Sequence, residues 1–206
     1  MRADFTSIFN QIADGLADQS FAVIDDFLRA PEANAILLGD EFANHKLHFR
    51  KAGIGKIDKQ ILEGVRGDYI QWIDPAVASP AERVYLDRLN DLLRFLNQAL
   101  FLSLKDIEIH RTVYPVGTRY QRHLDQFRVD DHRKLSVICY LNPDWKPEHG
   151  GQLRLYLDQG MLDILPERGK LAIFRSDLIE HEVLVATRER YSLTGWATDR
   201  APQLRG

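Results

Sequence analysis

The sequence has almost no cysteine: Cys139 is the single one among its 206 residues. A lone thiol cannot form an internal disulfide, and zinc sites built from cysteine need several thiolates. Any metal site in this chain must therefore use histidine and carboxylate ligands. We expect Cys139 to lie in the core and to face away from Tyr140, because neighbouring residues of a strand point to opposite faces.

Long hydrophobic runs and an excess of one charge are also missing. No apolar stretch is long enough to span a bilayer, and the first residues, MRADFTSIFNQIADGLADQ, carry acids where a signal peptide is apolar. We therefore expect a cytoplasmic protein that does not act at a membrane. The 27 basic and 30 acidic side chains leave a formal charge of -3, which argues against a nucleic-acid binder. The length fits one domain over residues 1–206.

The N-terminal part of the chain predicts supporting structure. Residues 1–45 read as helix, strand and helix: apolar residues recur at helical spacing from Phe5 to Leu16, FAVIDDFL looks extended, and Pro31 begins a second helix. Residues 47–67 contain several glycines and no sustained period, which predicts a long, mobile loop. Such a loop in a compact domain is usually functional, and we expect it to contact substrate.

The C-terminal part changes to short extended segments. A strand at Tyr69–Ile73 and an amphipathic helix at Pro80–Leu100 come first. Residues 105–199 then contain eight candidate strands, IEIHRTVY, RYQRHLD, KLSVICYLN, GQLRLYL, MLDILP, KLAIFR, EHEVLVA and RYSLTGWA. Eight strands predict a double-stranded β-helix, that is, a cupin-like jelly roll. The expected fold is mainly β, with the N-terminal helices packed outside this core.

Three residues in the strand region have the character of metal ligands. His123 and Asp125 end one predicted strand and share a face, while Leu124 points the other way. His181 begins a later strand. Two imidazoles and one carboxylate can occupy one face of an octahedral Fe(II) ion and leave positions for a co-substrate and oxygen. The first pair alone is weak evidence, because seven histidines and 30 acidic residues produce about one His-x-Asp/Glu by chance.

Arg190 strengthens the case for an iron site. It lies nine residues after His181 in the strand RYSLTGW, where alternation puts residues 190, 192, 194 and 196 on one face. An arginine pointing into a barrel is costly unless it meets an anion, and its planar fork suits a carboxylate. The distal carboxylate of 2-oxoglutarate would satisfy it.

Longer segments resemble a known family. YPVGTRYQRHLD, KLSVICYLNPDW, GGQLRLY and HEVLVATRERYSLTGW look like successive strands of the prolyl-hydroxylase-domain branch of the 2-oxoglutarate oxygenases, which includes the enzymes that hydroxylate hypoxia-inducible factor. RGDYIQW at residues 66–72 resembles a further motif of that branch. The resemblance runs from about Gly53 to Asp199, and compact, bacterial-type members of the branch are similar to this chain.

The resemblance implies roles for residues around the metal ligands. The co-substrate would be bound by Arg190 and by five further residues, namely Tyr140, Tyr114, Thr194, Trp196 and Leu153. The peptide substrate would be bound by Tyr120 in the pocket and by three residues near the entrance, namely Asp68, Trp72 and Arg133. On residues alone, aromatic residues such as Tyr120 and Trp196 on an inner face are more often simple core, and Asp68 could simply pair with Arg66.

The family chemistry implies the reaction. Fe(II), 2-oxoglutarate and O2 are the expected cofactor and co-substrates, with ascorbate as a candidate reductant and succinate and carbon dioxide as products. The substrate would be a prolyl residue of a protein or peptide, and a translation elongation factor is one candidate. Asp125 favours hydroxylation, because halogenating relatives replace this carboxylate.

Three alternatives remain at this level. The same metal centre could hydroxylate a free amino acid or small molecule, which the long loop disfavours. A cupin-like sensor of carboxylates would keep Arg190 but need no iron. A scaffold would bind its partner through the loop, independently of iron and of 2-oxoglutarate. The sequence names neither the target protein nor an oligomeric state.

Overall fold

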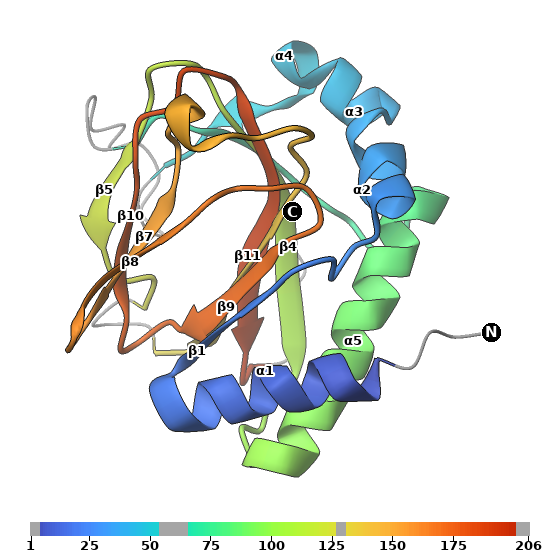
Figure 1. The fold of residues 1–206 in the computed structure, drawn as a ribbon. Coiled ribbons are helices and arrows are strands. Elements are labelled where there is room, and N and C mark those ends of the chain that lie inside the picture. The colour runs from blue at the N-terminus through green and yellow to red at the C-terminus, as the bar shows by residue number, and fades with distance from the viewer. Residues whose placement is uncertain (1–4, 54–65, 127–130, 201–206) are drawn as a thin grey trace.

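A computed structural model describes residues 5–53, 66–126 and 131–200 (Figure 1). The N-terminal part contains, in order, α1 (Thr6–Gln19), β1 (Phe21–Ile24), α2 (Ala30–Leu37), α3 (Asp40–Ala43), α4 (His45–His48), β2 (Arg50–Lys51), β3 (Tyr69–Trp72) and α5 (Pro80–Leu100). The C-terminal part contains β4 (Asp106–Tyr114), β5 (Tyr120–His123), β6 (Arg133–Tyr140), the 3-10 helix η1 (Pro147–His149), β7 (Leu153–Leu157), β8 (Gly160–Ile164), β9 (Leu171–Arg175), β10 (Glu180–Val183) and β11 (Arg190–Thr198).

The strands form two antiparallel sheets. The larger sheet has the order β1-β9-β6-β11-β4-β3-β2, and the smaller one has the order β5-β10-β7-β8. From β4 to β11 the chain crosses repeatedly between the sheets, and only the β7–β8 hairpin stays within one. The crossing brings strands that are distant in sequence side by side, such as β5 and β10. Two facing sheets with helices outside confirm the predicted jelly roll.

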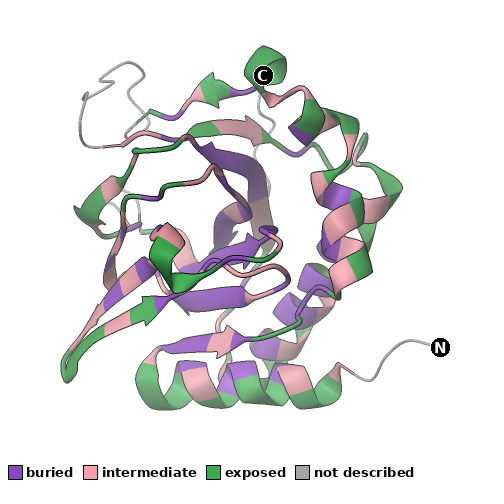
Figure 2. Ribbon diagram, turned by 45° about the horizontal axis from the view of Figure 1, so that its top comes forward, coloured by how far each residue is buried: buried purple, intermediate pink, exposed green. Residues whose placement is uncertain are grey.

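Each face of the larger sheet has its own apolar core. Tyr140 belongs to the core between the two sheets, together with Leu155 from the smaller sheet. Val137 belongs to the other core, where the outer face of the larger sheet packs against Leu92 of α5 and against α1 and α2. Figure 2 shows buried residues on the strands and on the sides of the helices that face them. The helices therefore buttress the sheet, and Cys139 lies in the outer core, on the opposite side from Tyr140, as expected.

Helix α5 begins at a capping box that is visible in the sequence. The amide of Glu82 donates to the Oγ of Ser79 at 3.3 Å, and the amide of Ser79 donates to the Glu82 carboxylate at 3.0 Å. Pro80 occupies the first turn, where its missing N–H costs nothing. The helix then runs to Leu100, which confirms the predicted boundaries.

The segment around the predicted loop differs in part from the expectation. The short helices α3 and α4 shape residues 40–48, and Arg50 of β2 pairs with Ile70 of β3. Four-residue helices complete too few turns to show a period, so the sequence pattern missed them. On the far side of the loop, Arg66 forms a β-bridge with Tyr120. The middle of the predicted mobile loop, residues 54–65, lies outside the described residues.

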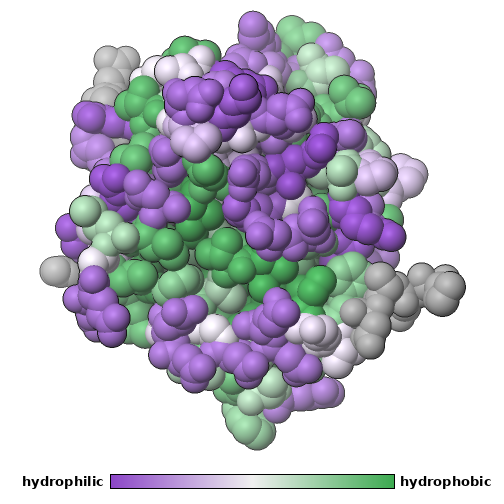
Figure 3. Space-filling view, viewed as in Figure 1, coloured by the Kyte–Doolittle hydropathy of each residue, from purple (hydrophilic) through white to green (hydrophobic). Residues whose placement is uncertain are grey.

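In the described part of the chain, no helix is both long and apolar enough to cross a bilayer. On the face drawn in Figure 3, hydrophobic residues gather across the middle and hydrophilic residues surround them.

Candidate metal and carboxylate site

The three predicted metal ligands converge at the edge where β5 meets β10. The register pairs His181 directly with His123, and Asp125 follows two residues after His123. One ligand atom from each of the three residues lies within 4.8 Å of the others. Leu124, between the first two, turns outward and is 38% exposed, as alternation predicts. The cluster confirms the expected convergence of two imidazoles and a carboxylate.

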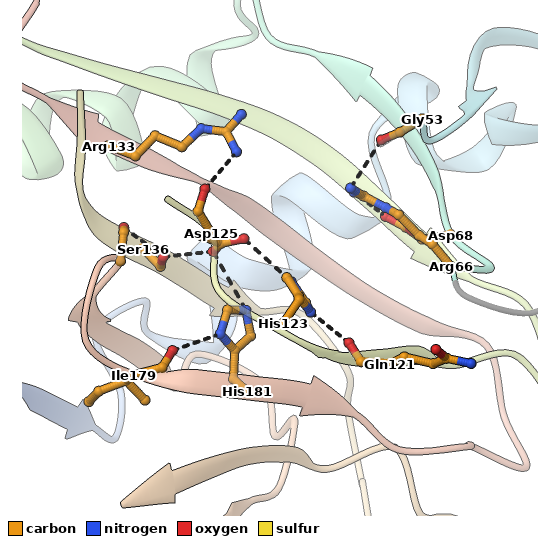
Figure 4. A network of polar contacts seen from close by, with 11 residues as sticks. Gly53, Arg66, Asp68, Gln121, His123, Asp125, Arg133, Ser136, Ile179 and His181 are labelled. Atoms are coloured by element: carbon orange, nitrogen blue, oxygen red, sulfur yellow. Dashed lines mark hydrogen bonds and ion pairs between the residues drawn. The ribbon is translucent and has the colours of Figure 1, made fainter. Parts of the chain in front are cut away.

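Backbone carbonyls orient both imidazoles (Figure 4). The Nδ1 of His123 lies 2.7 Å from the carbonyl oxygen of Gln121, and the Nδ1 of His181 lies 3.2 Å from that of Ile179. Each Nδ1 must donate its hydrogen there, since a carbonyl only accepts. In the neutral rings, Nε2 then carries a lone pair. Both Nε2 atoms face the carboxylate of Asp125, at 3.4 Å for His123 and 3.6 Å for His181.

The protonation states of these three side chains favour the binding of a cation. Burial lowers the pKa of His181 to about 4, so the ring is neutral near pH 7. Burial raises the pKa of Asp125, and the hydrogen bond that the Ser136 hydroxyl donates to its carboxylate lowers it. Electron-rich atoms therefore face one another in a buried site. A divalent metal ion fits this donor set, because it would neutralise the carboxylate and accept both lone pairs.

Aromatic side chains surround the cluster and restrict its access to water. The ring of Tyr120 stacks on His123 with centroids 3.6 Å apart, and Phe174 packs edge-on against His181 at 4.7 Å. A pocket opens beside the cluster between the two sheets. It is lined by Arg66, Asp68, His110, Thr112, Tyr114, Tyr120, His123, Asp125, Ile138, Leu153, His181, Val183, Arg190, Thr194 and Trp196. The three candidate ligands and Arg190 thus share one cavity.

Arg190 is a buried cation that lines the same pocket. Its side chain is 2% exposed, and its guanidinium lies between the rings of Tyr114 and Tyr140, at 5.1 and 4.9 Å from their centroids. Among the described residues, the Nε of Arg190 and the hydroxyl of Tyr140 are buried without a hydrogen-bond partner. Burial raises the pKa of Tyr140, so its hydroxyl keeps its proton and can donate. These donors fit a small carboxylate that the protein itself does not supply.

The other predicted site residues take up several positions. Tyr114, Thr194, Trp196 and Leu153 line the pocket, as do Tyr120 and Asp68. Tyr140 is not among the lining residues, but its ring centroid lies 4.9 Å from the Arg190 guanidinium. Trp72 is 38% exposed and packs against Trp196, with ring centroids 6.1 Å apart. The guanidinium carbon of Arg133 lies 3.4 Å from the centroid of the Trp196 ring, and the guanidinium donates to the backbone carbonyl of Asp125 at 3.2 Å. Arg133 therefore contacts the metal-ligand segment directly, and neither Arg133 nor Trp72 is among the residues that line the pocket.

Asp68 pairs with Arg66, which was one of the two readings of the sequence. Two hydrogen bonds, of 2.6 and 2.9 Å, join the guanidinium to the carboxylate. The pair is not a weak surface contact, because the side chains of Asp68 and Arg66 are only 1% and 12% exposed. The Arg66 guanidinium also lies over the ring of Tyr120 at 4.7 Å. The pair links the end of the loop segment to the pocket wall.

His110 is a pocket residue that the sequence reasoning missed. The sequence shows no partner for it, but it lines the pocket and its ring packs against Trp72 and Trp196. Its Nδ1 lies 2.8 Å from the Thr112 hydroxyl, and its Nε2 is buried without a described partner. Burial lowers its pKa to about 3, so the ring is neutral. Alternation from Tyr114 through Thr112 would have placed His110 on the inner face.

Comparisons with known proteins relate this chain to an oxygenase superfamily. Residues 109–198 match the 2OG-Fe(II) oxygenase superfamily. Over 154 residues the chain is 29% identical to a hypoxia-inducible factor prolyl hydroxylase of Caenorhabditis elegans, and this match covers 70% of the chain. The chain spans only 21% of the length of that relative.

Two solved structures are similar over nearly the whole chain. A prolyl-4-hydroxylase of Pseudomonas putida is 40% identical, with a TM-score of 0.84, and the match covers 94% of this chain and 100% of that one. A prolyl hydroxylase of Trichoplax adhaerens, in complex with a hypoxia inducible factor oxygen degradation domain peptide fragment, is 27% identical, with a TM-score of 0.85 and coverage of 94% and 90%. The likeness extends beyond the strands to the N-terminal helices.

Proposed function

Because this chain belongs to the 2OG-Fe(II) oxygenase superfamily, in its prolyl-hydroxylase branch, we propose that it hydroxylates a prolyl residue in a protein substrate. As a member of this family it is a 2-oxoglutarate-dependent dioxygenase, which requires Fe(II), 2-oxoglutarate and O2. The observation that carries the proposal is the shared cavity, in which a His-Asp-His cluster faces a buried arginine without a carboxylate partner among the described residues.

His123, Asp125 and His181 are the proposed iron ligands. The carbonyls of Gln121 and Ile179 hold the two imidazoles with Nε2 turned toward the metal position. Iron and 2-oxoglutarate, when bound, supply the oxidising chemistry: O2 delivers one oxygen atom to succinate and the other to the substrate carbon, with release of carbon dioxide. The protein's part is to bind, orient and shield the reactants.

Arg190 is the proposed anchor of 2-oxoglutarate. Its guanidinium and the Tyr140 hydroxyl would donate to the distal carboxylate, while Tyr114 and Thr194 line the space between this anchor and the metal ligands. Apolar groups such as Leu153 close the cavity. Charge-assisted hydrogen bonds in such a dry site bind carboxylates strongly and set the orientation of the co-substrate.

The residues proposed to contact the substrate are Tyr120, Trp196 and Asp68, which line the pocket, and Trp72 and Arg133, which pack against Trp196. Aromatic rings suit the apolar ring of proline. The likeness to an enzyme in complex with a peptide supports a protein substrate over a free amino acid. We propose a translation elongation factor as the first protein to test, since the chain matches a compact bacterial prolyl-4-hydroxylase along its full length.

The test measures succinate formation and peptide mass together. Purified protein is incubated with Fe(II), 2-oxoglutarate, ascorbate and O2, and with either proline-containing peptides from an elongation factor or free L-proline. We expect succinate to form in step with a proline that gains one oxygen, and we expect Asp125→Ala to abolish both. Oxidation of free proline but of no peptide would overturn the protein substrate. Coupled turnover in Asp125→Ala would overturn the metal-ligand assignment.

A further inference from the structure

Two buried serines form a hydrogen-bonded chain behind Asp125. The Oγ of Ser136, on β6, lies 2.7 Å from the Oδ2 of Asp125 and 2.9 Å from the Oγ of Ser176, just after β9. The serines are 1% and 0% exposed. Figure 4 shows Ser136 beside the Asp125 carboxylate, on the opposite side from His123. Neither serine lines the pocket, so neither is placed to contact a co-substrate or a peptide.

The direction of these hydrogen bonds follows from the chemistry of the groups. An ionised carboxylate only accepts, so the Ser136 hydroxyl must donate its one hydrogen to Asp125. The Ser136 oxygen is then free only to accept, and Ser176 must be the donor to it. The chain therefore runs from Ser176 through Ser136 to the carboxylate. A donor that itself accepts a hydrogen bond is polarised, which strengthens its bond to the charged group.

Asp125 depends on this hydrogen bond for its position, because it lies beyond the strand that carries His123. β5 ends at His123, so no strand ladder fixes Asp125. Its backbone carbonyl accepts from Arg133, and the amide of the next residue, Gln126, donates to the carbonyl of Ser176 at 3.1 Å. The Ser136 hydroxyl occupies one lone pair of Oδ2 and so restrains the rotation of the carboxylate. Backbone and side-chain contacts to β6 and β9 together hold this ligand.

We propose that Ser136 and Ser176 are positioning residues that fix the carboxylate of Asp125 and thereby set the affinity of the site for a divalent metal ion. The inference rests on the proposed function, since it takes Asp125 as a metal ligand. Hydrogen-bonded partners of metal ligands typically change affinity by about 10–100-fold when removed. Ser136 touches the carboxylate and should matter more than Ser176, which acts through it.

The experiment measures binding of Mn(II) to metal-free protein by electron paramagnetic resonance of the free ion. We expect Ser136→Ala to raise the dissociation constant by about tenfold or more, and Ser176→Ala to raise it by about threefold. Ser136→Thr keeps the hydroxyl and should restore nearly the original affinity. Ser192→Ala is the matched control, because Ser192 is also fully buried on the inner face but its hydroxyl contacts Thr194 at 3.0 Å.

The outcomes separate this inference from the proposed function. If Asp125→Ala binds Mn(II) as tightly as the unaltered protein, the ligand assignment and with it the proposed function fail. If Asp125→Ala loses binding while Ser136→Ala keeps it, the role of the serines alone is overturned. An equal loss in Ser136→Thr and Ser136→Ala would assign the effect to packing and also overturn it. Should Ser136→Ala not fold, Ser136→Cys keeps the size, replaces the hydroxyl with a weak donor, and is judged by the same criterion.

Discussion

On the outer face of the larger sheet, the guanidinium of Arg111 donates to Glu82 at 2.6 Å and to Gln71 at 3.0 Å. On the inner face of the neighbouring strand, Arg190 is buried to a similar degree, but its Nε has no described partner. The Glu82 carboxylate also accepts hydrogen bonds from the backbone amide and the hydroxyl of Ser79. These residues form an outer network in which the buried cation and the buried carboxylate are paired with each other.

Other buried polar groups show the same difference between the two faces of the larger sheet. Beneath the helices, Arg88 donates to Glu32 and to the carbonyl of Phe27. Around the pocket, Tyr140, His110 and Trp196 each bury a polar atom that lacks a partner in the described chain. The exception is the hydroxyl of Tyr85, a neutral group in the outer core. Because an unpaired buried group is costly, a cluster of them indicates a place where a ligand completes the bonding.

The largest expected effect comes from breaking the outer network. Arg111→Met leaves the Glu82 carboxylate buried without its cation and should lower the free energy of unfolding by about 3–5 kcal/mol. Urea denaturation measures this change. Arg94→Met is the control, because Arg94 and Asp91 form an exposed pair worth about 0–1 kcal/mol. Equal stability of the two variants would mean that the outer network is not structural.

The second prediction tests Arg190 on the inner face, whose Nε has no described partner. Arg190→Met should weaken binding of 2-oxoglutarate to the Mn(II)-loaded protein by about a hundredfold, or about 2.7 kcal/mol, because the distal carboxylate loses its cation. Calorimetric titration measures the affinity. The stability of the protein without ligand should stay the same or rise, since the substitution removes a buried guanidinium whose Nε has no described partner. A marked loss of stability would show that Arg190 has a structural partner. The inner and outer faces would then not differ in how their buried arginines are paired.

A smaller effect concerns pH. Burial would raise the pKa of Glu32, but hydrogen bonds from Arg88 and Arg29 outweigh it and lower this pKa from 4.5 to about 2. A lowered folded-state pKa adds stability above the unfolded value, and this contribution is lost as the pH falls from about 4.5 toward 2. Because solvent partly screens the group, we expect about 1–2 kcal/mol. Denaturation at pH 5.5 and pH 3, values chosen to bracket the shift, should show a smaller decline for Glu32→Gln. An equal decline would refute this source.

The smallest expected effect tests His110, the pocket residue found only in the structure. His110→Met removes the unpaired Nε2 but also removes the Nδ1 partner of the Thr112 hydroxyl; the two effects oppose each other, so stability should change by less than about 1 kcal/mol. If His110 contacts the peptide, kcat/KM for the peptide should fall by about tenfold, with unchanged affinity for 2-oxoglutarate. Unchanged kinetics would return His110 to a structural role on the inner face.

The sequence predicted much of this site because alternation along a strand is a strong local rule. His123 and Asp125 share a face, and so do Arg190, Thr194 and Trp196, all of which line the pocket. Residues without a distinctive pattern were missed. Ser136 looks like any strand serine, and His110 stood without a visible partner until the fold placed Trp72 beside it. Short helices such as α3 and α4 were missed for lack of a period.

The sequence by itself determined the chemistry of this protein: ligands limited to histidine and carboxylate, an arginine on an inner face, and strands that alternate toward a core. Only the tertiary structure decided that His181 lies opposite His123, since this register depends on how the chain crosses between the sheets. The crossing also placed Ser136 and Ser176 behind Asp125. Local geometry sets the face on which a side chain lies, but long-range strand pairing sets which faces meet.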